Sequence, residues 1–295
     1  MKKLSFFIAL LLLFSSALFA QMGINTDNSL PDNSAMLDVK SNSKGILIPR
    51  ITTDQRNAIS TPVDGLLIFN LTTGCFNYYL GGSWKSFCGA TEPEFQCGMK
   101  IIDSRDGKMY NTVKIGTQCW MAQNLNIGAR INGSQEQTNN SIIEKYCYAD
   151  LESNCDVYGG LYQWDELMQY ATTPGVQGIC PTGWHIPTDS EWTALTTFLG
   201  GESVAGGKMK EAGYVHWLSP NTGATNSSGF TALPGGYRDY GGYFSTLTSQ
   251  AYFWSSTEYS STNAWHRHLF YHYEDVYRYN LYSKTRGFSA RCVQD

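Results

Sequence analysis

Histidines are concentrated in one short segment near the end of the chain. His266, His268 and His272 are three of the five histidines, and all occupy even-numbered positions. On one continuous strand such positions share a face, so the three rings together with Glu274 could hold a metal ion. An exposed histidine-rich strand without a metal is the more frequent outcome, and Glu274 with Asp275 is typical of a turn. We therefore assign no metal and no cofactor to this segment.

Tyrosines are concentrated in the same region, because residues 252–282 contain seven of the chain's 19 tyrosines. A tyrosine ring offers rigid, amphipathic contact area at little entropic cost, which is why binding loops are rich in tyrosine. Packing of these rings between loops is the alternative, and the sequence does not decide between the two. For a binding segment, the expected ligand contacts are Tyr259, Asn263, His266, His268, Tyr271, Tyr273, Tyr277 and Tyr279.

A second candidate site is the segment Gly235-Gly236-Tyr237-Arg238. Its glycines could shape a pocket in which Tyr237 and Arg238 contact a ligand. The guanidinium of Arg238 has the geometry to bind a carboxylate through two parallel hydrogen bonds. An arginine bound to backbone carbonyls beneath a loop would have the same local sequence.

Motifs of common enzymes are missing from the sequence. It contains no nucleophile elbow, no phosphate-binding loop and no paired-histidine protease motif, which argues against ordinary hydrolase and nucleotide-binding functions. With a net charge of −4 and only 16% charged residues, the chain also lacks the basic character expected of a nucleic-acid partner. We therefore expect a protein that is not an enzyme and does not bind nucleic acid.

Residues 1–20 have the composition of a signal peptide. Lys2-Lys3 precede the apolar run Leu4–Leu13, and small residues lead to Ala20, after which we expect cleavage. An uncleaved anchor is the alternative, but the run is short against the about 20 residues of a membrane span. No later run reaches that length, so we expect no membrane span after signal removal. The expected location is outside the cell or on its surface, and the sequence is also compatible with the periplasm.

All eight cysteines follow the signal peptide, and an even number in an exported chain favours four disulfides. Eight cysteines allow 105 pairings, so their number alone does not identify the bridges. A zinc site is disfavoured because no Cys-x-x-Cys pair is present. The cysteines are Cys75, Cys88, Cys97, Cys119, Cys147, Cys155, Cys180 and Cys292.

The mature chain divides by composition into two parts. Residues 21–89 consist of short strand-like and turn-rich pieces, which predict a small β-rich stem. Such pieces bury too little apolar surface within one chain to be stable alone, so we expect association with other copies of the chain, with a loosely ordered spacer as the alternative. The polar, proline-bearing residues 90–96 are the expected linker, and residues 97–295 form the expected C-terminal domain.

The C-terminal domain carries two helix signals. Thr188 is a candidate N-cap with Glu191 as its capping-box partner, and Gly200 is expected to end this helix. An earlier helix is predicted from one apolar face, formed by Leu161, Trp164, Leu167, Met168 and Ala171. Asp106-Gly107 predicts a tight hairpin turn, and the sequence after Phe230 predicts short antiparallel strands. The expected core tryptophans are Trp120, Trp164, Trp184 and Trp192.

Several motifs of this domain occur together in one known family. They are Asp103–Lys108, Val113–Met121, Asn124–Asn126, Tyr158–Trp164, Cys180–Trp192, Phe253–Thr257 and Gly287–Cys292. With them, residues 97–295 resemble the Fibrobacter succinogenes major paralogous domain family, which is similar in fold to C-type lectins and formylglycine-generating enzymes. The resemblance implies an α+β, C-type lectin-like domain with two helices and short antiparallel strands, stapled by disulfides. It also implies scaffold roles for Trp254, Trp265, Arg267 and Arg291.

The resemblance extends to the stem and to the disulfides. Residues 21–89 resemble the N-terminal regions of secreted Bacteroidota proteins and the stem segments of phage tail fibres. Such stems are often trimeric, so the resemblance implies a homotrimer formed through residues 21–89. Together with sequence proximity, the family resemblance suggests the pairs Cys75–Cys88, Cys97–Cys119, Cys147–Cys155 and Cys180–Cys292. The Glu-Pro-Asn and Gln-Pro-Asp triplets of calcium-dependent lectins are absent, which leaves at most a structural calcium ion.

These observations predict a non-catalytic binding or adhesion protein. Its expected partner is an extracellular polysaccharide or a surface protein. A structural fibre or surface component is the first alternative. The second is an enzyme of the formylglycine-generating type, whose reactive cysteines would require free thiols in this chain.

Overall fold

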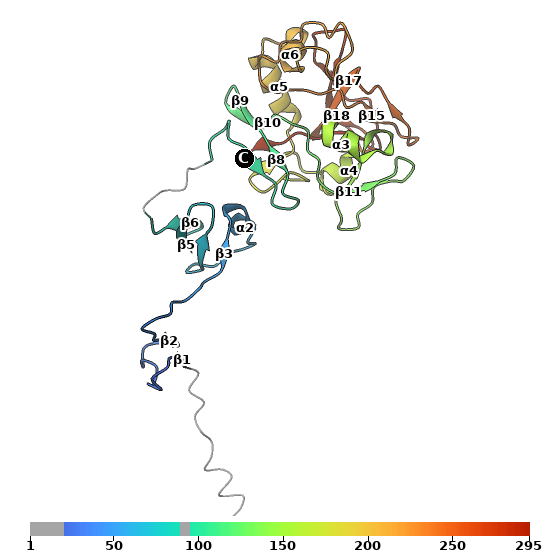
Figure 1. Cartoon of the computed structure of the whole chain (residues 1–295). Helices are drawn as coiled ribbons and strands as arrows, with labels where there is room; N and C mark the ends of the chain where they lie inside the picture. The colour runs from blue at the N-terminus through green and yellow to red at the C-terminus, as the bar shows by residue number, and fades with distance from the viewer. Residues whose placement is uncertain (1–20, 89–94) are drawn as a thin grey trace, which may run out of the picture. The chain divides into compact units, whose positions relative to one another are not determined.

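The computed structural model describes residues 21–88 and 95–295. The predicted signal peptide, residues 1–20, lies outside the described residues, as does most of the predicted linker, residues 90–96. The described chain forms two compact units, one with residues 21–53 and 62–88 and the other with residues 54–61 and 95–295. Figure 1 shows both units, with many of their elements labelled. Within these ranges no helix is both long and apolar enough to cross a membrane.

The N-terminal unit contains two small sheets. In the first, β1 (Met22–Ile24) pairs in parallel with β2 (Leu37–Val39). The second has the order β3-β4-β5-β6. Its strands are β3 (Arg50–Ile51), β4 (Leu67–Asn70), β5 (Cys75–Leu80) and β6 (Ser83–Ser86). Helix α2 (Thr53–Asn57) follows β3 in the sequence, and all of it except Thr53 is grouped with the other unit. Gly81 and Gly82 both have positive φ, as the two-residue turn between β5 and β6 requires.

Much apolar side-chain surface of this unit is uncovered. Ile68 is buried, whereas most of the other large apolar side chains described here are exposed. The exposed set is Met22, Ile24, Leu30, Met36, Leu37, Ile46, Leu47, Val63, Leu67, Leu71, Phe76, Leu80 and Phe87. A unit of this size with so small a core is marginally stable on its own.

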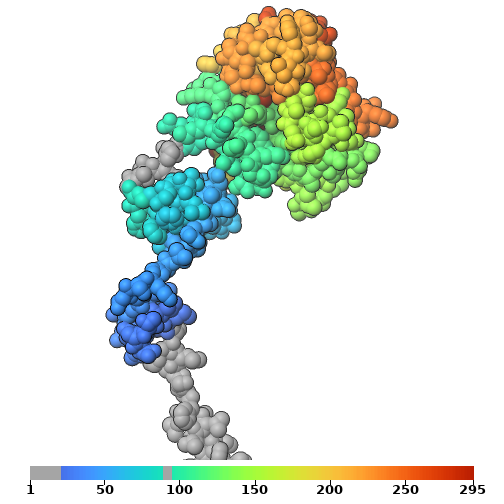
Figure 2. Space-filling model, viewed as in Figure 1, coloured from blue at the N-terminus to red at the C-terminus, as the bar shows by residue number. Residues whose placement is uncertain are grey.

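A seven-stranded sheet dominates the C-terminal unit, in the order β11-β12-β13-β20-β17-β18-β19. The strands are β11 (Ala129–Ile131), β12 (Glu144–Tyr146), β13 (Leu161–Tyr162), β17 (Gln250–Glu258), β18 (Ala264–Phe270), β19 (Tyr277–Tyr279) and β20 (Phe288–Ser289). Pairs β11–β12 and β17–β20 are parallel, and the other pairs are antiparallel. Figure 2 shows green and orange segments, which are distant in the sequence, lying side by side at the surface of this unit.

Smaller sheets complete this unit. A four-stranded sheet has the order β14-β21-β10-β9, and two hairpins pair β7 with β8 and β15 with β16. These strands are β7 (Ile101–Ile102), β8 (Met109–Tyr110), β9 (Thr112–Ile115), β10 (Gln118–Met121), β14 (Trp184–His185), β15 (Tyr237–Arg238), β16 (Phe244–Ser245) and β21 (Val293–Gln294). Between β7 and β8 the backbone N–H of Gly107 donates to the Asp103 carbonyl, which confirms the predicted tight turn. The chain is therefore rich in strands, with few helices.

Helix α5 (Asp189–Phe198) is the element that the sequence predicts best. Thr188 is its N-cap: the Thr188 hydroxyl accepts from the Glu191 backbone N–H, and the Glu191 carboxylate accepts from the Thr188 backbone N–H. This reciprocal capping box satisfies two backbone donors at the helix start. Trp192 and Leu195 are buried on the inner face of the helix. The predicted capped helix is confirmed.

The predicted first helix is wrong. Leu161 lies in β13, and the helix that follows is the single turn α4 (Trp164–Leu167). Gln169 and Tyr170 both have positive φ, so the backbone cannot continue as a right-handed helix. The other helices of this unit are α3 (Glu152–Tyr158), α6 (Glu202–Met209) and the 3₁₀ turn η2 (Tyr148–Asp150), and none of them is predicted from the sequence.

Helix α6 escapes prediction because it contains Gly206-Gly207, a pair that usually interrupts helices. The structure gives a packing reason for both glycines. A Cβ on Gly206 would lie 2.3 Å from the Asp275 carbonyl oxygen, and one on Gly207 would lie 2.4 Å from the Gly223 carbonyl oxygen. The glycines therefore allow neighbouring loops to approach the helix backbone closely.

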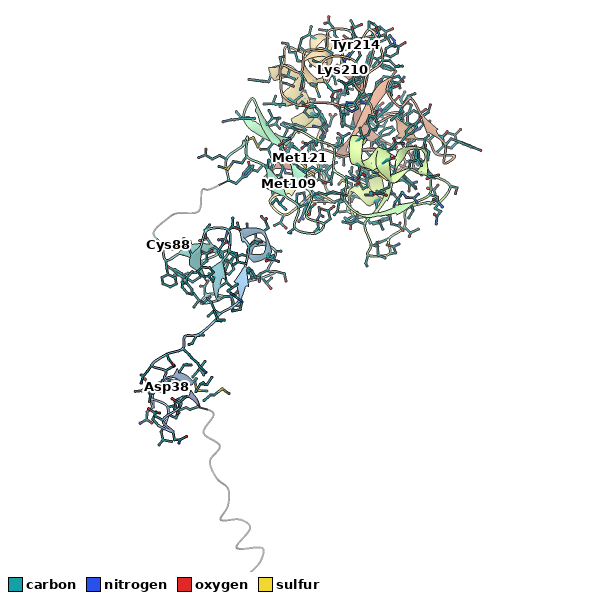
Figure 3. All side chains as sticks on the ribbon, viewed as in Figure 1. Asp38, Cys88, Met109, Met121, Lys210 and Tyr214 are labelled. Carbon is teal, nitrogen blue, oxygen red and sulfur yellow. A yellow bond between two sulfur atoms is a disulfide. The ribbon has the colours of Figure 1, made fainter. Side chains whose placement is uncertain are left out.

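The core lies on both faces of the large sheet. On one face, Phe253 and Leu269 cluster with Trp120 and Trp192. On the other face, Trp254 belongs to a second cluster that includes Trp164, Trp184 and Met121, the last labelled in Figure 3. All four tryptophans expected in the core are buried, which confirms the prediction. Trp254, Arg267 and Arg291 are buried as well, and Trp265 is partly exposed.

Four disulfides join the cysteines in the pairs expected from the sequence: Cys75–Cys88, Cys97–Cys119, Cys147–Cys155 and Cys180–Cys292. No cysteine of the described chain is free. The last bridge links residues 112 positions apart and ties the segment before β14 to the last strand. Because a longer loop loses more unfolded-state entropy when it is closed, this bridge should stabilise the fold most.

Replacing both Cys180 and Cys292 by alanine should therefore destabilise the protein more than replacing both Cys147 and Cys155. The entropy that the unfolded chain loses on loop closure predicts a stabilisation of about 5 kcal/mol for a separation of 112 residues and about 2.5 kcal/mol for a separation of 8. Urea unfolding of the two double variants measures the difference. Equal losses of stability would contradict this ranking.

Candidate binding site

The three strands β17, β18 and β19 present two cross-strand rows of aromatic rings on one face of the large sheet. The register places each β18 histidine between a ring on β17 and a ring on β19. Side chains at directly opposed positions of neighbouring strands are in contact distance. The rows are Trp254, His266 and Tyr279, and Tyr252, His268 and Tyr277.

Tyr282 lies in the segment that follows β19, and its ring packs against these rows. The rings of Tyr282 and His266 are stacked with centroids 5.1 Å apart, and those of Tyr277 and His268 with centroids 5.2 Å apart. Tyr273 continues the array, because its ring lies 6.1 Å from that of Tyr277. The inner rings are buried, whereas Tyr273 and Tyr279 are 45% and 39% exposed.

Arg286 connects this array to the hairpin of β15 and β16. Its guanidinium lies 4.5 Å from the ring centroid of Tyr282, 5.2 Å from that of Tyr237 and 5.5 Å from that of Tyr240. Cations at such distances from a ring face are attracted by its quadrupole. We call the resulting surface the aromatic face. It consists of Tyr237, Tyr240, Tyr273, Tyr277, Tyr279, Tyr282 and Arg286.

The structure brings together four of the expected ligand contacts, Tyr237, Tyr273, Tyr277 and Tyr279. Tyr259, Asn263 and Tyr271 lie elsewhere. The Tyr259 ring packs on Trp265 at 5.5 Å, near the turn where the Tyr259 backbone N–H donates to the Asn263 carbonyl. Tyr271 packs against the core cluster on the opposite face of the sheet.

The expectation that His266 and His268 are exposed is wrong. They are 0% and 4% exposed, because rings from both neighbouring strands cover them. Burial lowers the pKa of His266 to about 3 and that of His268 to about 4, so both imidazoles are neutral at physiological pH. Both ring nitrogens of His266 are buried without a hydrogen-bond partner in the described chain. These histidines form the rigid layer beneath the tyrosines.

The expectation that Arg238 contacts a ligand is also wrong. Its guanidinium is buried and donates to the backbone carbonyls of Gly133, Gln135 and Thr285, as well as to the Glu136 carboxylate. Each of its three nitrogens donates to an acceptor within the chain and the side chain is buried, so Arg238 does not present the free, two-pronged guanidinium that was expected to bind a ligand carboxylate. The alternative of an arginine held beneath a loop is the one observed.

The histidine segment does not form a metal site. His266 and His268 point into the aromatic array, whereas His272 lies beyond the end of β18 and is exposed. Among the residues that the structure describes, no group of three or more histidines, cysteines and acidic residues could hold a metal ion.

Three residues of the aromatic face were not expected from the sequence: Tyr240, Tyr282 and Arg286. Tyr240 lies in the turn between β15 and β16, where Asp239 Oδ1 accepts the backbone N–H groups of Gly241 and Tyr243. An aspartate followed by glycines is a readable turn signal, and it would have identified an exposed tyrosine. Arg286 carries no such local signal, since its role follows from the tertiary fold.

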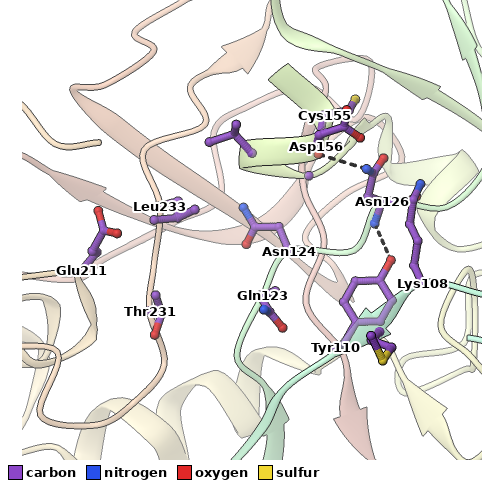
Figure 4. A pocket seen from close by; sticks show the side chains of 13 residues that line it. Lys108, Tyr110, Gln123, Asn124, Asn126, Cys155, Asp156, Glu211, Thr231 and Leu233 are labelled. Atoms are coloured by element: carbon purple, nitrogen blue, oxygen red, sulfur yellow. Dashed lines mark hydrogen bonds between the residues drawn. The ribbon is translucent and has the colours of Figure 1, made fainter. Parts of the chain in front are cut away.

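A separate hollow of about 440 Å³ lies in the same unit (Figure 4). Its lining comes from β8, the segment after β10, helix α3 and the loops near Glu211 and Leu233. The side chains around it are mostly polar, and none of them belongs to the aromatic face. The polar lining residues include Lys108, Gln123, Asn124, Asn126, Asp156 and Glu211.

Two known protein families match parts of the sequence. Residues 113–294 match the Fibrobacter succinogenes major domain, and residues 23–100 match a phage tail like trimerisation region. The first match covers more than half of the chain, so the protein belongs to the Fibrobacter succinogenes major domain family. Both resemblances expected from the sequence are thereby confirmed. No curated protein and no solved structure matches the chain.

The buried histidines predict an acid-sensitive fold. Below pH of about 6.5 the unfolded chain binds protons at these imidazoles, whereas in the folded state their pKa values of about 3 and 4 keep them neutral. Stability should therefore fall as the pH drops from 6.5 to 4. In His266→Phe this loss should be smaller by roughly 3 kcal/mol, measured by urea unfolding at a series of pH values. Exposed His272→Gln is the control, and an unchanged pH slope in His266→Phe would refute the account.

Proposed function

We propose that this member of the Fibrobacter succinogenes major domain family is an exported, non-catalytic binding protein. It acts outside the cell or at the cell surface, where it recognises a polysaccharide or a surface protein. Its domain families indicate a surface or structural protein. The observation that carries the step to binding is the aromatic face.

The aromatic face has the physical properties of a recognition surface. Its outer tyrosines offer exposed ring area next to the guanidinium of Arg286. The buried histidines and Trp254 beneath them hold the rings in place, so little side-chain entropy remains to be lost on binding. Tyrosine and arginine are the residues that most often dominate binding interfaces. Both sugars with apolar faces and protein surfaces would suit these rings.

A C-type lectin-like fold would suit this role and is part of the proposal. The long Cys180–Cys292 bridge, the capped helix α5 and the strands after residue 230 are compatible with it. Because all eight cysteines are paired, the alternative of a formylglycine-generating enzyme lacks the free thiols it would need.

The N-terminal stem is proposed to assemble three copies of the chain. Its exposed apolar side chains need a partner, and the matched trimerisation region covers this part of the sequence. An apolar hollow of about 270 Å³ is lined by Ile46, Leu47, Ile48, Arg50, Phe69 and Phe76, and it offers a seat for a neighbouring copy. Three linked domains would raise avidity for a repetitive ligand. The same stem also favours the second candidate function, a structural fibre component.

Removing exposed tyrosine rings of the aromatic face should weaken ligand binding without unfolding the protein. The double variant Tyr240→Ala/Tyr279→Ala should weaken binding to a glycan or surface-protein array by at least about tenfold, since a tyrosine that acts as a binding hot spot contributes about 2 kcal/mol or more. Its melting temperature should change little, because both side chains are exposed. Tyr259→Ala, outside the aromatic face, is the matched control. Equal binding by the double variant and the control would overturn the role of this face.

Trimer formation is tested by the mass of the assembled protein. Native mass spectrometry should give three copies for the unmodified chain and one copy for Leu47→Asp, because the charge cannot be buried in an apolar interface. Leu218→Asp changes an exposed leucine of the C-terminal unit and should leave the assembly intact. A strict monomer of the unmodified chain would rule out the trimer.

A further inference from the structure

The hollow in Figure 4 has a rigid, hydrogen-bonded floor made by Asn124 and Asn126. The Asn124 amide donates to the Tyr158 carbonyl, and its oxygen accepts from Arg291 Nε at 2.7 Å. The Asn126 amide donates to the Cys155 carbonyl, and its oxygen accepts from Lys145 Nζ at 2.6 Å. Because these amides are held from behind, the floor is organised before any ligand arrives.

One wall is equally fixed and presents a free carboxylate. Helix α3 contributes Asp156 and Val157, and the Cys147–Cys155 disulfide anchors the helix next to them. Both side chains are exposed. Within the described chain, the Asp156 carboxylate forms no ion pair and no side-chain hydrogen bond. It is therefore free to accept hydrogen bonds from a ligand.

Lys108 and Gln123 offer hydrogen-bond donors to the hollow. Lys108 Nζ donates to the Asn126 carbonyl at 2.6 Å and lies 3.5 Å from Asp106, which leaves one of its three N–H groups for another partner. The Gln123 side-chain oxygen accepts the Asn111 backbone N–H at 2.6 Å, and its amide N–H groups are left over. Figure 4 shows Lys108 and Glu211 at opposite sides of the hollow, with Asn124 and Gln123 between them.

The charges around the hollow disfavour acidic ligands. The positive charge of Lys108 is already offset by Asp106. Asp156 has no counter-ion in the described chain, and Glu211 adds a second carboxylate, which lies 2.8 Å from His216 Nδ1. Leu233 also lines the hollow and offers an apolar contact. The hollow therefore combines carboxylate acceptors, amide and ammonium donors and small apolar patches. This combination suits a ligand that has many hydroxyl groups and also exposes C–H groups.

We propose that this hollow binds a single sugar residue without an acid group, either neutral or bearing an amine. Sugar hydroxyls would donate to Asp156 and Glu211 and accept from Lys108 and Gln123. The volume of about 440 Å³ is within the usual range of roughly 300–1,000 Å³ for small-molecule sites. The site shares no residue with the aromatic face, so it goes beyond the proposed function and can fail independently of it.

Saturation-transfer NMR on the purified full protein tests the proposal with glucose, galactose, mannose, N-acetylglucosamine, glucosamine and glucuronic acid as probes. At least one neutral or amino sugar should give signals, and glucuronic acid should give none. Asp156→Asn should weaken this binding at least tenfold. Val157→Trp should block it by filling the hollow, whereas Val215→Trp, at an exposed valine elsewhere in this unit, should not.

Three results would overturn the proposal. They are silence of all neutral and amino sugars, preference for glucuronic acid, and binding that Asp156→Asn leaves unchanged. Tyr240→Ala/Tyr279→Ala should not alter this binding. If that double variant removes the sugar signals while Asp156→Asn retains them, the hollow is not the site and the aromatic face remains the binding surface. Asp156→Asn changes an exposed side chain, so the test holds even if Val157→Trp fails to fold.

Discussion

Buried cations bound to backbone carbonyls are the interaction on which the C-terminal unit depends. Arg291 donates to the carbonyls of Met121, Phe230 and Thr231 and to the Asn124 side chain, and none of its partners in the described chain is a carboxylate. Burial lowers its pKa to about 9, which still leaves it charged at neutral pH. Lys210 Nζ likewise donates to three carbonyls, those of Thr222, Phe270 at the end of β18, and Tyr273. A unit with long loops must satisfy many carbonyls outside regular elements, and these side chains do so.

The same contacts position both candidate binding sites. Arg238 binds the Thr285 carbonyl, directly before Arg286 of the aromatic face. Arg291 holds Asn124 in the floor of the hollow. The four disulfides add covalent constraints, of which Cys180–Cys292 spans the longest stretch of chain. Loops that would otherwise be mobile therefore present their side chains on a rigid scaffold, as recognition at low entropic cost requires.

Local signals made part of this structure predictable. The capping box of α5, the turn at Asp106-Gly107 and the buried tryptophans all depend on neighbouring residues or on strong hydrophobicity. The failures arise from tertiary contacts. The glycines of α6 serve close packing rather than a turn, and Arg238 is held by the carbonyl of Gly133, 105 residues away in the sequence. The tyrosine- and histidine-rich segment was recognisable as a candidate surface, but the strand order decides which rings are covered: the histidines on β18 lie between β17 and β19, whereas Tyr279 lies on the edge strand β19.

The central claim is that ligand recognition takes place on the aromatic face. A hydrogen–deuterium exchange footprint, recorded with and without the tightest ligand from a glycan and surface-protein array, tests it most directly. The account predicts protection in β19, in the turn after β15 and in residues 282–286, and little change in the stem. Protection confined to residues 21–88, or to the opposite face around Tyr259 and Trp265, would contradict it.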